Sequence, residues 1–481
     1  MLSPIFMRRT ELARPPRDAV DRARRKLEAA LGASKIDADP ARLLAYGGDE
    51  SENDAVAPDL AVLATSAEDV AAALRVAREE RVPITPRAGG SGKSGGAIPV
   101  AGGIALATAG LCAIKEIDRK EHVAVVEPGV ILGDLHRAVE AEGLFYPPDA
   151  NSLEVCALGG NVAENAAGPR ALKYGPTRDY VTGLELALVG GEKMFVGRRT
   201  KKGVTGYDLA ALVVGSEGTL AVVTEITLRL LPKPEKIRTL LALFSDVREV
   251  SPAVTAMLEA RVVPRCVELL DRRTLDAVRK KGVGVDARAG AMLVVEVDGS
   301  EAACDADMER VGGACSSAGA LDVLVAQDEA QRERLWSARR SLSHATRAMA
   351  RHKVSEDVVV PRSAIGVLLE RVDRIRESTG IDMLTYGHAG DGNLHVNFLW
   401  NDDDAVPRVE AGLAALFRAV VELRGTLTGE HGVGLSKQPY LRLEQSDGVI
   451  DLQRRLKATF DPDGLLNPGK IFPKTTSHGG C

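Results

Sequence analysis

The first hundred residues combine helical and extended spacing of their apolar positions. Residues 17–31 have apolar side chains at helical intervals. Residues 58–64 form an apolar run typical of a strand. Residues 66–82 form an amphipathic helix that starts with Ser66 as its N-cap and has acidic residues in its first turn. A further short strand over 83–89 leads into a glycine-rich loop. The pattern therefore predicts a β–α–β start.

The middle of the chain continues with short apolar runs. Three of them are typical of strands and cover residues 103–111, 124–130 and 184–191. A fourth, over 221–234, closes with Pro232 and Pro234. Because proline cannot continue a central strand, these prolines predict a domain boundary.

Residues 235–330 alternate between strand and helix patterns. Strands are expected over 237–244, 291–297 and 322–328, and a helix over 251–260. This order predicts a second, α+β domain with an antiparallel sheet. Helical spacing returns after residue 405, in 409–425, and the chain closes over 460–472 with a turn-rich and then extended segment. The sequence contains no internal repeat.

Composition narrows the class of protein. A chain of 481 residues with 45% hydrophobic residues indicates a soluble globular protein of two or three domains. A net charge of −5 argues against a nucleic-acid partner. No apolar run reaches the ~18 residues that a membrane-spanning helix needs, and the N-terminus lacks the apolar segment of a secretory signal. We expect a cytoplasmic location, or a peripheral one at the inner face of a membrane.

The cysteines limit the possible metal sites. They are scattered, and none forms a CxxC pair. Neither a zinc ribbon nor an iron–sulfur cluster can be built locally from them. A reducing compartment is expected, and any metal must be held by histidines and carboxylates.

A glycine-rich loop within residues 83–100 superficially resembles an ATP-binding loop. Residues 92–94 read Gly-Lys-Ser, but Arg87 occupies the position of the first glycine of that motif. The helix that should begin at the lysine is disfavoured by two glycines and Pro99 within residues 95–99. Without that helix, a bound phosphate would lose its favourable interaction with the helix dipole. An NTPase is therefore disfavoured, and Lys93 is expected to face solvent.

The loop still predicts an anion site, because clustered glycines let several backbone N–H groups converge. A flexible surface loop is the alternative interpretation, but the apolar flanks favour a shaped turn between strands. Two more segments extend the pattern. Residues 147–188 are dense in small residues that permit close approach to a flat ligand, and residues 214–232 follow as a third element.

These three segments, in this order, resemble the FAD-binding domain of the vanillyl-alcohol oxidase / p-cresol methylhydroxylase superfamily over about residues 45–232. The resemblance implies that the first loop binds the FAD pyrophosphate, the second lies along the isoalloxazine, and the third helps to close the site. The implied FAD-binding residues are Pro86, Arg87, Gly89, Gly90, Ser91, Gly92, Ser94, Gly95, Gly96, Pro148, Gly159, Gly160, Asn165, Gly168, Tyr174, Gly175, Glu217, Ile226 and Asn467. Residues 86–99 contain no histidine, so non-covalent FAD is expected.

Two short motifs hold three of the histidines, "YGHAGDGNLHVNF" (386–398) and "LTGEHGVG" (427–434). Strand alternation places His395 and Asn397 on one face, and the turn after His388 returns it to the same site. Glu430 and His431 share a tight glycine-flanked loop. Two histidines and a carboxylate suit Zn²⁺ or a similar divalent ion with open positions. The alternative is ordinary buried histidines, but their clustering favours a metal.

This half, about residues 234–473, resembles the C-terminal FAD-linked oxidase domain of the D-2-hydroxy-acid dehydrogenases. That family includes D-lactate dehydrogenases, D-2-hydroxyglutarate dehydrogenase and the flavin subunit of bacterial glycolate oxidase. The resemblance implies metal binding by His388, His395 and Glu430. It also implies His431 as catalytic base, a substrate contact from Asn397, and carboxylate capture by Arg339, three residues after Trp336.

The family likeness implies a flavin-dependent dehydrogenase that oxidises a short D-2-hydroxy acid, glycolate or D-lactate, to the 2-oxo acid. Lys353 lies two residues further upstream than the matching lysine of 2-hydroxyglutarate-type members. This departure disfavours D-2-hydroxyglutarate, which remains the alternative substrate. A non-catalytic flavin subunit is another alternative. Electrons would leave to a partner iron–sulfur subunit, a quinone, a cytochrome or an electron-transfer flavoprotein.

The expected architecture is α+β. A helical segment (1–44) precedes a two-subdomain FAD-binding domain (45–232). An α+β substrate domain with an antiparallel sheet (233–473) and a short tail (474–481) follow.

Overall fold

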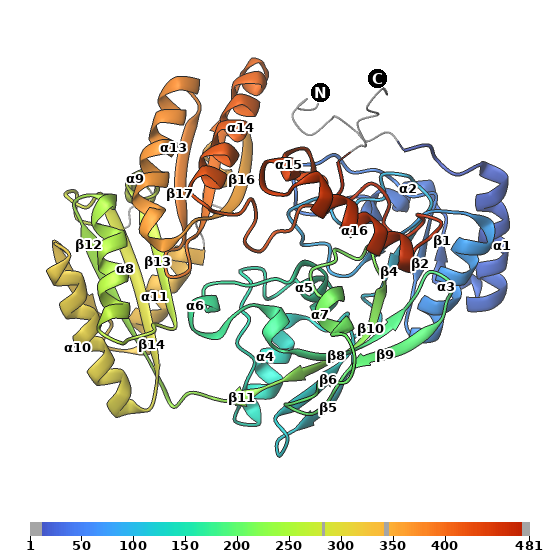
Figure 1. Cartoon of the computed structure of the whole chain (residues 1–481), viewed down its shortest axis with the longest axis horizontal. Helices are drawn as coiled ribbons and strands as arrows, with labels where there is room; N and C mark the ends of the chain where they lie inside the picture. The colour runs from blue at the N-terminus through green and yellow to red at the C-terminus, as the bar shows by residue number, and fades with distance from the viewer. Residues whose placement is uncertain (1–11, 281–283, 341–345, 474–481) are drawn as a thin grey trace.

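The computed structural model describes residues 12–280, 284–340 and 346–473. Within these ranges the strands form three larger sheets and one two-stranded sheet. Figure 1 shows the first two of the larger sheets on one side of the molecule and the third, with its helices, on the other.

The first sheet has four strands in the order β1-β2-β4-β3. Its elements are α1 (Arg17–Leu31), β1 (Ile36–Asp37), α2 (Pro40–Leu43), β2 (Leu60–Leu63), α3 (Ala67–Glu80), β3 (Ile84–Arg87) and β4 (Ile104–Ala107). The predicted β–α–β start is confirmed, with β4 inserted in parallel between β2 and β3. Ser66 caps α3 as predicted, because its side chain accepts a hydrogen bond from the Asp69 N–H at 3.1 Å.

The second sheet is antiparallel, in the order β5-β6-β10-β8-β9. Its strands are β5 (Ile114–Asp118), β6 (Val123–Val126), β8 (Val181–Ala187), β9 (Lys193–Gly197) and β10 (Val222–Arg229). Its helices are α4 (Leu132–Ala141), α5 (Leu158–Glu164), α6 (Ala171–Tyr174) and α7 (Leu209–Val213); β7 (Leu144–Phe145) pairs with β11 (Leu231–Pro232). An apolar core that includes Val126, Leu184 and Ile226 joins the sheet to these helices.

The third sheet has seven strands, and every pairing in it is antiparallel, as predicted. The strands are β12 (Lys236–Phe244), β13 (Cys266–Asp271), β14 (Ala291–Gly299), β15 (Asp322–Val325), β16 (His352–Val359), β17 (Asp382–His388) and β18 (Asn393–Trp400). The helices are α8 (Val250–Glu259), α9 (Arg272–Lys280), α10 (Glu301–Ser317), α11 (Glu329–Arg340), α13 (Ile365–Thr379) and α14 (Val406–Glu422). The large core includes Phe244, Phe398 and Phe417 and lies between the sheet and helices α8, α10, α13 and α14.

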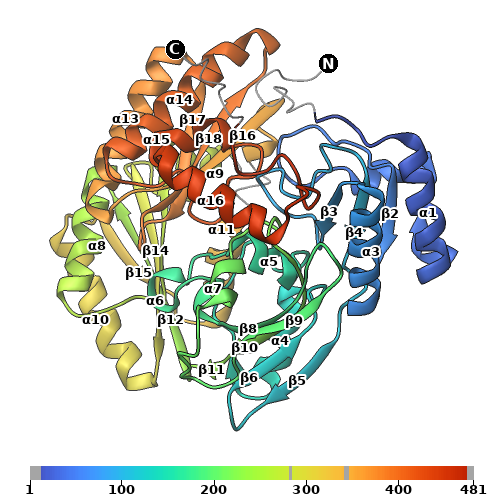
Figure 2. The same cartoon turned by 45° about the vertical axis from the view of Figure 1, so that its right-hand side comes forward.

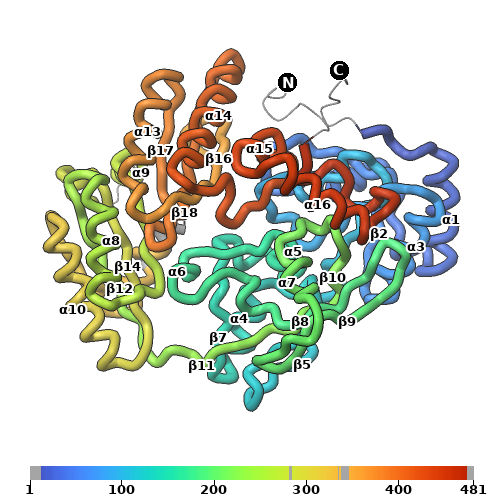
Figure 3. The backbone as a smooth tube through the Cα atoms, in the orientation of Figure 1, coloured from blue at the N-terminus to red at the C-terminus, as the bar shows by residue number. Residues whose placement is uncertain are grey.

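The last part of the chain returns to the part of the molecule that contains the first two sheets, which we call the first half. Helices α15 (Leu441–Glu444) and α16 (Asp447–Phe460) lie across the first half, as the tube in Figure 3 shows. The prediction of an extended segment within 460–472 is wrong in one respect, because no strand forms there. Only an isolated bridge joins Leu466 to Ile84. Positive φ angles at Asn467 (46°) and Ile471 (67°) interrupt an extended course.

Candidate functional site

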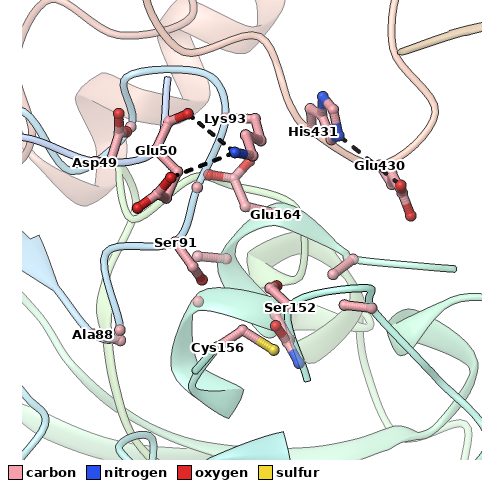
Figure 4. A pocket seen from close by; sticks show the side chains of 18 of the residues that line it. Asp49, Glu50, Ala88, Ser91, Lys93, Ser152, Cys156, Glu164, Glu430 and His431 are labelled. Atoms are coloured by element: carbon pink, nitrogen blue, oxygen red, sulfur yellow. Dashed lines mark hydrogen bonds and ion pairs between the residues drawn. The ribbon is translucent and has the colours of Figure 1, made fainter. Parts of the chain in front are cut away.

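A cavity of about 350 Å³ is lined by residues from both halves of the molecule. Figure 4 shows it between the glycine loop, α5 and the loop that carries Glu430 and His431. Of the predicted residues, those lining it are Pro86, Arg87, Gly89, Gly90, Ser91, Gly92, Gly96, Gly159, Gly160, Gly168, Glu217, Asn467, His388, His395, Glu430 and His431. The cofactor segments and the histidine motifs therefore face one space.

Other predicted residues lie behind the cavity wall. They are Ser94, Gly95, Pro148, Asn165, Tyr174, Gly175, Ile226 and Asn397. Asn165 accepts a hydrogen bond from the Arg178 N–H at 2.8 Å, and the Tyr174 hydroxyl donates to Asp298 at 2.8 Å. Ile226 is fully buried in the core of the second sheet. None of these residues lines the cavity, and their contact with a cofactor stays a prediction.

The glycine loop joins β3 to β4 and contains no helix. The helix that an ATP-binding loop requires is therefore absent from this described segment, which rules out the NTPase reading. The backbone N–H groups of residues 89–92 donate to no other group of the described protein. Gly90 has φ +67°, and a Cβ at Gly89 would lie 2.7 Å from the Val155 carbonyl oxygen. The loop thus offers free donors in a turn that side chains would obstruct, which suits a pyrophosphate. As predicted, Lys93 is exposed, and it reaches Glu50.

Helix α5 presents a bare surface to the cavity. A Cβ at Gly160 would meet nothing within 4 Å, whereas one at Gly159 would lie 2.6 Å from the Pro128 side chain. Gly159 therefore lets α5 pack closely, and Gly160 leaves room on the cavity side. A flat ring can approach such a surface, so this segment also fits the FAD assignment.

His388, His395 and Glu430 form the predicted metal-binding set. One ligand atom from each lies within 4.8 Å of the others. The Nε2 atoms of His388 and His395 lie 3.9 and 3.6 Å from Oε1 of Glu430. β17 and β18 supply the histidines on either side of their connecting turn, as the sequence predicted. Two imidazoles and a carboxylate fit a divalent ion of the zinc type with open positions.

Glu268 stands behind this set. Its carboxylate accepts a hydrogen bond from Nδ1 of His388, so that Nε2 faces Glu430. Burial alone would lower the pKa of His388, but the carboxylates of Glu268 and Glu430 outweigh it and raise that pKa. Burial would raise the pKa of Glu430, and the neighbouring histidines instead lower it to about 2. A carboxylate that orients a metal-binding histidine is a common arrangement.

Asp357 stands behind His431. Its Oδ1 lies 3.3 Å from Nδ1 of His431. Its Oδ2 accepts hydrogen bonds from the N–H groups of Gly429, Glu430 and His431 at 2.8, 2.7 and 3.1 Å. The buried Lys437 ammonium also donates to it. Burial lowers the pKa of His431, which favours a neutral ring. Asp357 therefore holds both the backbone of this loop and the orientation of the ring.

Two predicted substrate contacts have different outcomes. Asn397 lies on β18 as expected, but its side-chain amide donates to the carbonyls of His395 and Leu384 at 2.9 and 3.3 Å. It lies beneath His395 and does not line the cavity. Arg339 is on α11, three residues beyond the cavity-lining Trp336, and its side chain lies outside the described part of the structure.

The loop over residues 427–436 is bonded to the first half of the molecule. Glu217 accepts hydrogen bonds from the N–H groups of Val433 and Gly434 at 2.8 and 2.7 Å. The Ser94 carbonyl oxygen accepts from the N–H groups of Leu435 and Ser436 at 2.8 and 3.2 Å. The glycine loop and the loop of Glu430 and His431 are thus joined directly.

Sequence reasoning missed Glu268 and Asp357. Glu268 is an acidic residue inside the largely apolar strand β13, which is an available signal, whereas Asp357 lies among other polar residues in β16 and gives none. β16 also pairs Asp357 with His395 and Ser355 with Asn397 across the sheet. The register therefore gathers polar residues on one face beside the cavity.

Comparisons with solved structures define the class of protein first. p-Cresol methylhydroxylase with substrate bound superposes with a TM-score of 0.82 at 17% identity, covering 96% of this chain and 99% of that one. 4-Ethylphenol oxidase from Gulosibacter chungangensis superposes with a TM-score of 0.79 at 20% identity, covering 96% and 98%. The chain has the two-domain flavoprotein fold of these enzymes.

Sequence comparisons then identify the family. The family model "FAD binding domain" matches residues 58–196, and "FAD linked oxidases, C-terminal domain" matches 233–471. The glycolate oxidase subunit GlcD of Bacillus subtilis is 40% identical over 92% of this chain and 95% of its own length. A D-lactate dehydrogenase of Anaerostipes hadrus is 33% identical over 87% and 90%. The chain belongs to the FAD-linked oxidases and is an FAD-binding oxidoreductase.

In the described part of the chain, no helix has both the length and the apolar character needed to span a membrane.

Proposed function

We propose that the enzyme oxidises glycolate or D-lactate to the corresponding 2-oxo acid, with non-covalently bound FAD as electron acceptor. The observation that carries this proposal is the shared cavity: His388, His395, Glu430 and His431 line the same space as the glycine loop. Relatives named as glycolate oxidase and D-lactate dehydrogenase support the substrate class.

The chain's own residues would divide the chemistry as follows. FAD, when bound, supplies the acceptor for two electrons and for the hydrogen of the substrate α-carbon. A divalent ion held by His388, His395 and Glu430 would supply Lewis acidity. His431 would accept the hydroxyl proton at Nε2, because its Nδ1 faces Asp357. Arg339 would bind the substrate carboxylate in a bidentate manner.

One observation favours a second candidate, D-2-hydroxyglutarate. Lys353 is buried, lines the cavity and donates to Thr346 at 2.8 Å. It lies on β16 four residues before Asp357, roughly 13 Å along the strand. Burial lowers its pKa to about 8. A cation in the wall of the cavity that the histidines also line suits a substrate with a second carboxylate. A D-2-hydroxyglutarate dehydrogenase of Stutzerimonas stutzeri is 30% identical over 93% of the chain.

Anaerobic bleaching of the flavin tests the function. Glycolate, D-lactate, L-lactate and D-2-hydroxyglutarate are mixed separately with the FAD-loaded protein, and loss of flavin absorbance is followed by stopped flow. We expect bleaching by glycolate or D-lactate and none by L-lactate. Faster bleaching by D-2-hydroxyglutarate would establish the second candidate instead.

The His431→Ala variant tests the base. We expect it to keep its FAD and to bleach about 10²–10⁴-fold more slowly than wild type. His352→Ala is the matched control, because His352 lies on β16, stacks on Trp400 and pairs with Asp403 outside the cavity. If His431→Ala bleached as fast as the control, the role assigned to His431 would be wrong.

A further inference from the structure

The segment between β9 and α7 is exposed to an unusual degree. Every residue from Lys201 to Leu209 is exposed. Val204 and Tyr207 have 98% and 95% of their surfaces accessible. Isolated exposed apolar side chains are common, but an aromatic and an aliphatic residue with no packing at all stand out.

Further exposed apolar side chains lie on the two elements that flank this segment. Met194 and Phe195 on β9 are 40% and 53% exposed, and Leu209 at the start of α7 is 37% exposed. β9 is an edge strand of the second sheet. We call this surface the β9–α7 patch; it consists of Met194, Phe195, Lys201, Lys202, Val204, Tyr207 and Leu209. Its Tyr, Phe and Met content is typical of protein interfaces.

The patch is positively charged in an acidic protein. The basic residues Lys193, Arg198, Arg199, Lys201 and Lys202 follow one another with no acidic residue between positions 193 and 207, whereas the whole chain carries −5. Lys193 and Arg199 pair with Glu68 and Glu116. Lys201 and Lys202 form no ion pair with any residue that the structure describes. They therefore offer charge to a partner.

The patch is also close to the cofactor cavity. α7 begins at the exposed Leu209 and ends at Val213, which is buried and lines the cavity. At 1.5 Å per residue this helix covers about 6 Å. Figures 1 and 2 both show α7 beside α5, whose Gly160 faces the cavity. A partner seated on the patch would therefore be near the flavin.

We propose that the β9–α7 patch is the docking surface for an acidic redox protein that takes electrons from the reduced flavin. The inference rests on the proposed function only in requiring that the flavin is reduced during turnover. In the transfer, the two-electron-reduced flavin returns to its oxidised form. Two one-electron centres of the acceptor each gain one electron, and the flavin protons go to water. A membrane partner is less well matched, because the basic residues of the patch are Lys201 and Lys202 alone, whereas electrostatic attachment to lipid uses four to eight clustered basic residues.

The test compares two acceptors that share one haem but differ in charge. Native cytochrome c is basic, and succinylated cytochrome c is acidic. The FAD-loaded protein is photoreduced, so that no substrate is needed, and haem reduction is followed at low and high salt. We expect faster reduction of the succinylated form at low salt and a loss of that advantage at high salt.

Charge reversal in the patch should abolish the preference. Lys201→Glu/Lys202→Glu should reduce succinylated cytochrome c about tenfold more slowly and bind it more weakly in biolayer interferometry. Tyr207→Ala should weaken binding without reversing the charge preference. Arg362→Glu/Arg418→Glu, on the exposed surface of the other domain, makes the same change in net charge and should leave both readouts unchanged. A small dye should reoxidise all variants at the same rate.

Three outcomes would overturn the proposal. The first is equal loss in both double variants, which would show that only net charge matters. The second is unchanged cytochrome reduction together with loss of binding to phosphatidylserine vesicles, which would assign the patch to a membrane. The third is dissociation of a dimer by Tyr207→Ala in analytical ultracentrifugation, which would assign it to a second copy. Failure of 2-hydroxy acids to bleach the flavin would affect the proposed function alone, because photoreduction does not use them.

Discussion

At the scale of single residues, two buried carboxylates determine which way two histidines face. Glu268 accepts from Nδ1 of His388, and Asp357 lies beside Nδ1 of His431. Each leaves the Nε2 atom of its histidine available to the site. The two positions can be tested separately. Substitution of Glu268 should affect metal binding, and substitution of Asp357 should affect the loop that carries His431.

Glu268→Gln should weaken metal binding while FAD content is unchanged. The amide no longer offers a charged acceptor to His388, and loss of such a partner costs about 10- to 100-fold in metal affinity. Zinc content after dialysis against a graded chelator series measures this. Glu259→Gln, at an exposed position on α8, is the control. Equal zinc retention in Glu268→Gln and Glu259→Gln would show that Glu268 does not support metal binding. If wild type lost zinc as readily as Glu268→Gln, the proposed metal site itself would be wrong.

Asp357→Asn should destabilise the protein by about 3–5 kcal/mol, because it leaves the buried Lys437 ammonium with only the more distant Glu356 carboxylate, at 3.6 Å. It also replaces one of the two carboxylate oxygens by an NH2 group, so that a single uncharged oxygen remains to accept from the loop N–H groups. The urea midpoint, read by circular dichroism, measures the change. Asp402→Asn, at an exposed position beyond β18, should leave the midpoint in place. An unaltered midpoint in Asp357→Asn would show that the loop is held by other contacts.

At the scale of elements, the closing segment after α16 fastens the glycine loop. The Asn467 amide donates to the carbonyls of Gly96 and Glu217 at 3.0 and 2.9 Å. Lys470 donates to the Ile98 carbonyl and is almost completely buried. Burial lowers the pKa of Lys470 from 10.5 to about 7, and the facing carboxylates of Asp49 and Glu217 only partly oppose this.

The lowered pKa of Lys470 makes stability depend on pH. Between pH 7 and 10.5 the unfolded chain holds this proton and the folded chain does not, so stability rises with pH across that window. Lys470→Met removes the contribution of this ammonium group to the pH dependence of stability. The rise in unfolding free energy from pH 7 to pH 9 should therefore be about 2 kcal/mol smaller in the variant. Urea titrations at both pH values, with the exposed Lys120→Met as control, measure the difference. Parallel curves for wild type and Lys470→Met would contradict the prediction.

The elements themselves could be predicted because each depends on local spacing. Apolar periodicity gave the helix over 17–31 and the strand before the glycine loop, and glycine density located the loop. The family resemblance implies Tyr174 and Ile226 as cofactor residues, but it does not tell which way their side chains point: the Tyr174 hydroxyl donates to Asp298, and Ile226 lies in the core of the second sheet. Asp357 and His431 are 74 residues apart. The segment that leads to His431 is joined to β16 by an isolated bridge between Thr426 and Val359, so contacts between parts distant in the sequence bring the two residues together.

At the scale of the whole molecule, buried charges join the two domains. Asp298 on β14 accepts from Tyr174 and pairs with Lys173 at 2.5 Å, both on α6. It also pairs with the buried Arg265 at 2.5 Å. Arg265 in turn reaches Glu296 at 3.4 Å. This network fixes how the third sheet sits against the cofactor half.

Asp298→Ala should lower the unfolding free energy by about 3–5 kcal/mol, because it leaves Arg265 short of a partner in the interior. Calorimetry measures the shift of the transition, and the flavin released on heating reports whether the cavity opens earlier. Asp305→Ala removes the exposed pair with Arg238 and should cost less than about 1 kcal/mol. Similar shifts in the two variants would show that the interface network contributes no more than a surface pair.

The bonds of Ser94 and Glu217 to residues 433–436 set a limit on exchanging parts between relatives. A chimaera joined near residue 233 would combine one parent's glycine loop with another parent's Glu430 and His431, although these segments share hydrogen bonds. The residues that have to be exchanged together therefore do not form one contiguous domain. An exchange of substrate domains between members of this family has to carry residues 427–436 and their partners from the same parent.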